Sequence, residues 1–194
     1  FWALFINFSV GQSMPGQPTL FCNMLDIRRV DSSELGLLLE FAERTFRVAF
    51  QQLNDPRAFE LYCSTVFTPE HFQAQFDNPL AQFWFVFSDN RLAAYFKLNL
   101  DVAPAGMDAP RGTQVERLYV DAAFQGQRIG EQMLHHTEEQ ARGRKEEWVW
   151  LSTWKKVPAA IRFYQRCGYE IFGEEVFWVG DDPQMDWLMR KRVM

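Results

Sequence analysis

Residues 115–136 read VERLYVDAAFQGQRIGEQMLHH: an apolar stretch, a turn that contains glycine, and then an amphipathic segment. The apolar stretch has the pattern of a β-strand, whereas Ile129, Met133 and Leu134 recur at helical spacing. A helix that begins directly after such a turn has backbone N–H groups without intrahelical partners, and its dipole is positive at that end. The turn QGQRIG at 125–130 is therefore a candidate phosphate-binding site, with an ordinary tight strand–helix turn as the alternative.

This stretch joins two predicted strands, 113–120 and 147–154, through a helix expected over 126–144. Because a strand–helix–strand connection within one sheet is right-handed, the two strands are expected to be parallel neighbours. The runs at 82–102 and 169–193 each contain two strands about a polar turn, which is typical of antiparallel hairpins. The sequence thus predicts a single α/β domain with a mixed, mostly antiparallel sheet, one central parallel strand pair and helices on both faces.

The remaining helices are predicted from the residues at their ends. Capping side chains and first-turn prolines place helix starts after Asp31 or Ser32, at Pro56 and at Pro69. A last helix over 158–167 also begins with Pro, and Gly168 follows it. Gly at that place predicts a left-handed C-cap.

The composition allows one compact domain and argues against two classes of protein. The 194 residues suffice for one domain with a sizeable core, since 47% of them are hydrophobic. The formal net charge of −5 argues against a nucleic-acid-binding protein, which usually has a basic surface. The apolar opening, FWALFINFSV, is too short to cross a bilayer, so no membrane association is expected.

The cysteines and histidines predict neither a disulfide framework nor a metal site. Cys22, Cys63 and Cys167 are odd in number and far apart, which is typical of a protein in the reducing cytosol. His135 and His136 are adjacent, and no histidine is spaced with Cys or carboxylate residues in the manner of a zinc site. We therefore expect a cytoplasmic protein without a metal ion.

The first 23 residues differ from the rest of the chain. The apolar opening is followed by GQSMPGQPTLFCN at 11–23, which is rich in Gly and Pro, and then by Met24. We interpret residues 1–23 as an N-terminal appendage (a leader, an upstream start or an expression remnant) and 24–194 as the domain. A packed N-terminal arm or a partner-binding segment is the alternative.

Two motifs resemble one known superfamily. YVDAAFQGQRIGEQML at 119–134 resembles motif A of the GNAT superfamily of N-acetyltransferases, and FYQRCGY at 163–169 resembles its Phe-Tyr-x-x-x-Gly-Phe helix. RTFRVAFQQLNDP at 44–56, QFWFVF at 82–87 and FWVGDDPQMDWLMRK at 177–191 are similar to the bacterial PaiA-type spermidine/spermine N-acetyltransferases. The resemblance spans about residue 25 to the C-terminus, and it implies a GNAT-like fold with acetyl-CoA as the cosubstrate.

The resemblance also implies where acetyl-CoA binds. The superfamily holds it in an opening between two parallel strands, here 113–120 and 147–154, whose backbone pairs with the pantetheine arm while the turn at 125–130 holds the pyrophosphate. Arg166 is expected to reach a phosphate, with an exposed helix arginine as the alternative. The implied cofactor-binding residues are Leu118, Tyr119, Val120, Gln125, Gly126, Gln127, Arg128, Ile129, Gly130, Ala159 and Arg166.

Two positions depart from the superfamily's pattern. Arg128 stands where a glycine is usual; we expect a helical backbone there, which needs no glycine and leaves both the N–H and the guanidinium available to a phosphate. Val157 and Ala159 occupy the region of an Asn that often contacts the cofactor. One hydrogen bond, worth about 1 kcal/mol, is expected to be missing there.

Acetyl transfer needs a neutral amine and a proton for the departing thiolate. By resemblance, Tyr164 is the general acid that protonates the sulfur of CoA; a core tyrosine whose hydroxyl donates to a backbone carbonyl is the alternative. Glu116 is the candidate base, because strand alternation places it on one face with Leu118 and away from Arg117. An ion pair with a nearby arginine is its alternative.

The sequence therefore predicts an acetyl-CoA-dependent N-acetyltransferase that acts on a primary amine, with a polyamine such as spermidine or spermine as the expected acceptor. One alternative is another acceptor: an amino acid, an antibiotic or a protein N-terminus. The other is a regulatory module that binds acyl-CoA without catalysis. The expected partners are a small amine and no nucleic acid or membrane, and the sequence leaves open a monomer or a homodimer.

Overall fold

The computed structural model describes residues 25–105 and 110–194, which form one α/β domain around a seven-stranded sheet. The predicted appendage at 1–23 lies outside the described residues. In chain order the elements are β1 (Leu25–Arg29), α1 (Leu35–Phe50), α2 (Pro56–Val66), α3 (Pro69–Phe76), β2 (Ala81–Ser88), β3 (Arg91–Val102), β4 (Gly112–Val120), α4 (Ile129–Gly143), β5 (Trp148–Trp154), α5 (Pro158–Arg166), β6 (Glu170–Val179) and β7 (Asp182–Arg192).

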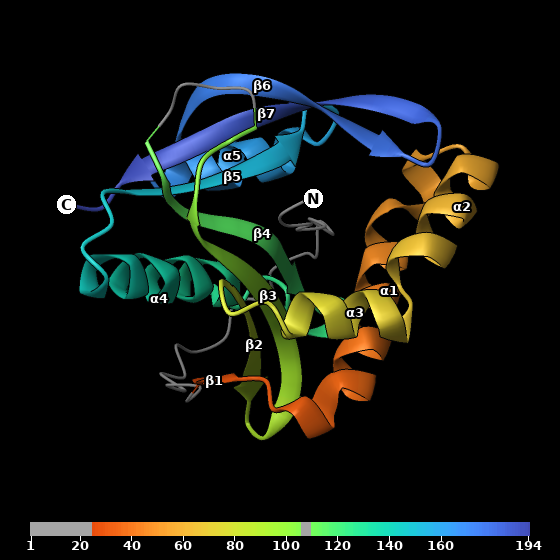
Figure 1. Cartoon of the computed structure of the whole chain (residues 1–194), viewed down its shortest axis with the longest axis horizontal. Coiled ribbons are helices and arrows are strands. Elements are labelled where there is room, and N and C mark those ends of the chain that lie inside the picture. The colour runs from red at the N-terminus through yellow and green to blue at the C-terminus, as the bar shows by residue number, and fades with distance from the viewer. Residues whose placement is uncertain (1–24, 106–109) are drawn as a thin grey trace, which may run out of the picture.

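The strand order is β1-β2-β3-β4-β5-β7-β6. The pair β4–β5 is parallel, as the crossover helix between them predicts, and the other neighbours are antiparallel. The predicted mixed and mostly antiparallel sheet with one central parallel pair is thereby confirmed. In the sequence α4 connects β4 to β5. In Figure 1, β4 turns away from β5 and toward β3.

Aromatic contacts place helices on both faces of the sheet. Tyr119 of β4 faces α1, where its ring lies 6.3 Å from that of Phe46. Phe96 of β3 faces the other way, and its ring lies 6.0 Å from that of His136 in α4. Helix α5 lies on the α4 side, because Arg166 and Glu131 line the same hollow. Helices α1–α3 therefore form one layer and α4 and α5 the other (Figure 1).

The predicted helix ends are present in the structure. The Asp31 side chain accepts a hydrogen bond from the N–H of Ser33, and Asp55 and Thr68 cap α2 and α3 in the same way. Gly168 has a φ of 88°, as expected of a left-handed cap. Within the described ranges, no helix is long and apolar enough to span a membrane.

Gly112 lies at the point where β4 and β5 are in contact. A Cβ atom at this position would come within 2.2 Å of the carbonyl oxygen of Trp148, which is backbone and cannot rotate away. We expect Gly112→Ala to push the two strands apart and lower the free energy of unfolding by about 1–3 kcal/mol, measured by urea denaturation.

The control for that measurement is Gly36→Ala in the first turn of α1, where an added Cβ would meet nothing within 4 Å. It is expected to leave stability unchanged or raise it by up to about 1 kcal/mol, because Ala is the better helix former. Equal effects of the two substitutions would contradict the close approach at Gly112.

Candidate active site

The candidate site begins where β4 and β5 separate. Their paired residues are Thr113 with Val149 and Gln114 with Trp150, and no further pair joins the two strands in the described part of the chain. Leu118, Tyr119 and Val120 come after this point; they remain paired with β3 on one side. On the side toward β5, their backbone groups line the opening. An extended ligand can form hydrogen bonds there as an added strand would.

The turn after β4 leads the chain to the start of α4. Asp121 caps a short 3-10 helix, and its carboxylate lies 2.6 Å from Arg44 of α1. Gly126 has a φ of 80°, and α4 then begins at Ile129. The first N–H groups of α4 have no intrahelical partner by the geometry of a helix, so they and the positive end of the dipole suit a pyrophosphate.

The backbone conformation of Arg128 differs from the one predicted from the sequence. We expected a helical backbone there, but Arg128 is the N-cap residue of α4 with φ 59° and ψ 19°, in the left-handed region. The helix begins one residue later than a helical Arg128 requires, because the turn from Gln125 to Ile129 reverses the chain direction within four residues. This explains why glycine is usual at this position, since a side chain makes the conformation unfavourable.

The predicted cofactor residues outside the turn lie on α5. Ala159 is half-buried in its first turn. Arg166 is exposed in its last turn and lines a hollow together with Glu131 and His135 of α4. Whether Arg166 reaches a phosphate stays a prediction.

Tyr164 is buried on α5, and its hydroxyl has no hydrogen-bond partner within the described residues. The alternative drawn from the sequence, a hydroxyl tied to a backbone carbonyl, is therefore absent. Burial raises the pKa of Tyr164 well above its ordinary value, so the phenol keeps its proton at neutral pH. Burial likewise raises the pKa of Tyr119, which lies on β4 after the last residue paired with β5, well above its ordinary value.

Glu116 lies in an irregularity of β4. In the register with β3, Lys97 pairs with Arg117 and Leu98 pairs with Val115, so Glu116 is the extra residue of a β-bulge. The predicted alternation, with Glu116 beside Leu118 and away from Arg117, is wrong for this reason. Both Glu116 and Arg117 turn toward α3, where the Arg117 guanidinium lies 5.1 Å from the ring of Phe72.

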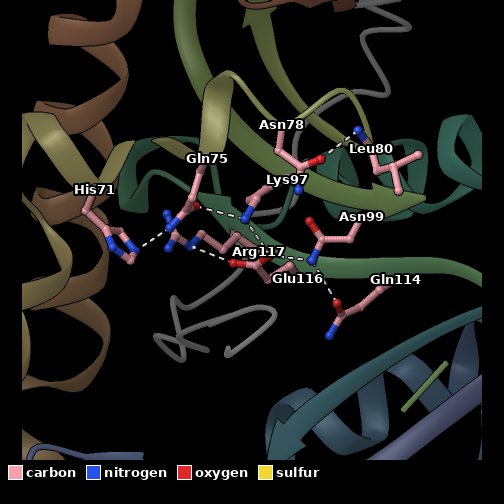
Figure 2. Close-up of polar contacts among 9 residues, drawn as sticks. All are labelled: His71, Gln75, Asn78, Leu80, Lys97, Asn99, Gln114, Glu116 and Arg117. Carbon is pink, nitrogen blue, oxygen red and sulfur yellow. Dashed lines mark hydrogen bonds and ion pairs between the residues drawn. The ribbon is translucent and has the colours of Figure 1, made fainter. Parts of the chain in front are cut away.

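Glu116 is part of a buried polar network, which Figure 2 shows together with its neighbours. Its Oε2 accepts hydrogen bonds from Lys97 Nζ and from Asn99 Nδ2, each at 2.5 Å, and its Oε1 lies 3.6 Å from Arg117 Nε. The network continues from Asn99 to Gln114, and from Lys97 through Gln75 to His71. Side chains from α3, β3 and β4 are thereby joined under the helical layer.

This network decides between the two interpretations of Glu116. Burial alone would raise the pKa of Glu116, but the charges of Arg117 and Lys97 and the hydrogen bonds from Lys97 and Asn99 outweigh it and lower the pKa. Burial also lowers the pKa of Lys97 to about 8. An ionised carboxylate between two cations is a weak proton acceptor. The geometry thus favours the ion pair over the role of base, with Lys97 as the partner that the sequence had not suggested.

The comparisons with known proteins agree with this geometry. The profile of the Acetyltransferase (GNAT) family matches residues 42–169. The chain belongs to the GNAT acetyltransferase family. Proteins of this family bind acetyl-CoA, and the backbone opening, the helix start and the buried Tyr164 hydroxyl suit that cosubstrate. Within the described ranges, no three His, Cys, Asp or Glu side chains gather as a metal ion would require.

The chain is similar to several different acetyltransferases. An uncharacterized N-acetyltransferase from the pepI 3' region of Lactobacillus delbrueckii subsp. lactis is 29% identical over 87% of this chain and 97% of its own length. The PaiA N-acetyltransferase of Thermoplasma acidophilum, solved in complex with coenzyme A, has a similar structure (TM-score 0.67, 17% identity, 87% of this chain and 99% of that one). The ribosomal-protein-S18-alanine N-acetyltransferase of Escherichia coli also has a similar structure (TM-score 0.64, 14% identity, 88% of this chain and 94% of that one covered). The two structures support the GNAT fold.

Replacement of Arg128 by Gly is expected to raise the free energy of unfolding by about 1 kcal/mol, because glycine adopts the left-handed conformation without strain. Urea denaturation without ligand measures this. Arg128→Ala is the matched control: it also removes the guanidinium but keeps the strain, so its stability should equal that of the wild type. A weaker affinity for CoA in both variants would assign the guanidinium to the phosphates.

Glu116→Gln is expected to lower the free energy of unfolding by about 3–5 kcal/mol, because it leaves Lys97 and Arg117 buried with one anion fewer. The control is Glu60→Gln, which removes a carboxylate that is 55% exposed and paired with Arg47; a loss of no more than about 1 kcal/mol is expected. A Glu116→Gln variant of wild-type stability would contradict the structural importance of the pair.

Proposed function

We propose that this protein transfers the acetyl group of acetyl-CoA to a primary amine, with a polyamine such as spermidine or spermine as its acceptor. The observation that carries the proposal is the Tyr164 hydroxyl on α5, the helix that follows β5: it is buried, it keeps its proton, and it has no hydrogen-bond partner among the described residues. A phenol in that state can donate a proton to a departing thiolate. The thiols of Cys63 and Cys167 are free, in keeping with a place in the cytosol.

Two parts of the chain would bind different parts of acetyl-CoA. The backbone of Leu118, Tyr119 and Val120 would pair with the pantetheine arm, and the amides from Gln125 to Gly130 would hold the pyrophosphate at the start of α4. Acetyl-CoA supplies the acetyl group as a thioester. The amine nitrogen bonds to the acetyl carbon as the carbon–sulfur bond breaks. The sulfur takes the proton of Tyr164, and the proton that the nitrogen releases replaces it. No acyl-enzyme is formed.

The choice of a polyamine rests on the C-terminal segment and on one related structure. The segment FWVGDDPQMDWLMRK resembles the PaiA-type enzymes, and the PaiA structure of Thermoplasma acidophilum is similar to this fold. The similarity to the ribosomal-protein-S18-alanine N-acetyltransferase keeps a peptide acceptor as an outcome of the test. The assay must therefore include both acceptor classes.

Tyr164→Phe is expected to lower kcat at least tenfold and to leave the Kd of CoA unchanged, because it removes only the proton donor. Release of free thiol from acetyl-CoA is measured with spermidine, spermine, simple diamines, amino acids and an alanine-ended peptide. Tyr169→Phe, at a second buried tyrosine whose ring lies 6.0 Å from that of Tyr164, should keep activity within about twofold.

Turnover with polyamines would support the proposal in full. Turnover with other amines alone would contradict the polyamine acceptor and leave acetyl transfer in place. CoA binding without turnover on any amine would indicate a binding module without catalysis.

A further inference from the structure

Asp186 is a carboxylate in the interior that the sequence analysis did not single out. It lies on β7, where its neighbours in the register are Trp154 of β5 and Glu175 of β6. Its side chain is fully buried. Trp154 ends the part of β5 that runs beyond the last residue paired with β4, so Asp186 is one strand away from the opening.

The two oxygens of Asp186 have no hydrogen-bond partner among the described residues. The other buried carboxylates there are paired: Glu116 with Lys97, and Glu138 with Lys191 through two bonds of 2.8 Å. A buried acceptor without a donor lowers stability, so folded proteins rarely keep one for structural reasons. Among the described residues, Asp186 thus has no hydrogen-bonded cation of the kind that Glu116 and Glu138 have.

A third acceptor without a partner lies on the same face, two residues earlier on β7. The amide of Gln184 donates from Nε2 to Asn54 at 2.6 Å and to Asp182 at 2.8 Å, which fixes the orientation of that amide. Its Oε1 is buried and has no donor in the described part of the chain. Gln184 and Asp186 therefore present three acceptor oxygens on one side of β7. A primary ammonium carries three N–H donors.

This side of β7 faces the helical layer that also covers β4. Phe177, the register partner of Gln184, packs its ring 5.8 Å from that of Tyr62 in α2. Tyr62 in turn lies 5.4 Å from Phe46, the α1 residue whose ring meets Tyr119 of β4. The aromatic layer thus extends from β4 to β6, and the strand ends on either side of the opening lie under it.

The charges around Asp186 are unbalanced. Glu175 is directly opposite on β6, and like charges in that position repel each other. Lys155 attracts the carboxylate but also forms an ion pair with Glu174 and lies 3.7 Å above the ring of Trp187, on the other face of the hairpin. On the side that faces the helices, the polar side chains near Gln184 and Phe177 are those of Asn54 and Tyr62, which are neutral. Burial is the largest influence and raises the pKa of Asp186 to about 7; of the described charged residues, Glu175 raises it and Lys155 lowers it.

We propose that Gln184 and Asp186 bind the ammonium group of the acceptor and that Asp186 takes its proton, which makes Asp186 the base of the acetyl transfer. The proposal rests on the function proposed above. Asp186 in its ionised form accepts one proton from the ammonium and becomes a neutral acid. The free amine then forms the C–N bond while the C–S bond breaks. Tyr164 gives its proton to the sulfur and regains one from the nitrogen of the new amide, and Asp186 releases its proton to water.

The test is Asp186→Asn, which keeps the size of the side chain and removes the base. We expect kcat/KM for the accepted amine to fall at least a hundredfold, with the Kd of CoA unchanged. The Tm at pH 8 should be equal to or higher than that of the wild type, because a buried charge without a partner is removed. Asp181→Asn, the same change at an exposed position of the same hairpin, is the control and should keep full activity.

The pH dependence of kcat/KM gives a second test, made on the wild type and on Asp186→Asn. For the wild type, kcat/KM should rise with pH and level off above about 7, because only the ionised Asp186 can take the proton. This inflection should be absent in Asp186→Asn. Full activity of the variant, or a wild-type profile without the inflection, would overturn the proposal.

A binding experiment distinguishes failure of the ammonium site from failure of the proposed acetyl transfer. If the wild type turns over no amine, the proposed acetyl transfer fails, and binding of spermidine in the presence of CoA is measured by calorimetry. Binding that is lost in Asp186→Asn would still support the ammonium site. Equal binding by both proteins, or by neither, would overturn it.

Discussion

The parallel pairing of β4 and β5 at only two positions is the constraint on which the rest of the structure depends. Two central strands that separate within a sheet leave backbone N–H and C=O groups facing each other across an opening, and such groups need partners. An extended ligand that carries amides of its own can supply them. The turn after β4 and the start of α4 follow directly from the first of these strands, and α5, which carries Tyr164, follows directly from the second.

The buried charged residues on the two sides of the opening have different partners. On the β4 side, Lys97, Arg117 and Glu116 neutralise one another within a network that reaches α3, so this side is built for stability. On the β7 side, Asp186 and the oxygen of Gln184 have no donors in the described part of the chain. Two buried acceptor side chains that lie close together on one strand without a donor among the described residues form a candidate binding site for a donor.

Much of the fold and part of the site were predictable from local patterns. The strand–turn–helix stretch at 115–136, the helix caps at Asp31, Asp55 and Thr68 and the last hairpin depend on neighbours in the sequence, and all were confirmed. The role of Glu116 was not predictable, because a single bulge in β4 reverses the face on which its side chain lies. Arg128 was misjudged as well, since the reversal of the chain between β4 and α4 sets its backbone angles.

The sequence by itself determined the family, the order of the elements and the candidate cofactor turn, since motif spacing and periodicity are local properties of the chain. The tertiary structure alone decided which charged groups meet. Lys97 and Glu116 are 19 residues apart, and only the register of β3 with β4 makes them an ion pair. Asp186 looks in the sequence like one polar residue among apolar neighbours. That its carboxylate has no hydrogen-bond donor among the described residues follows from the packing of β5, β6 and β7, because the possible partners come from other parts of the chain.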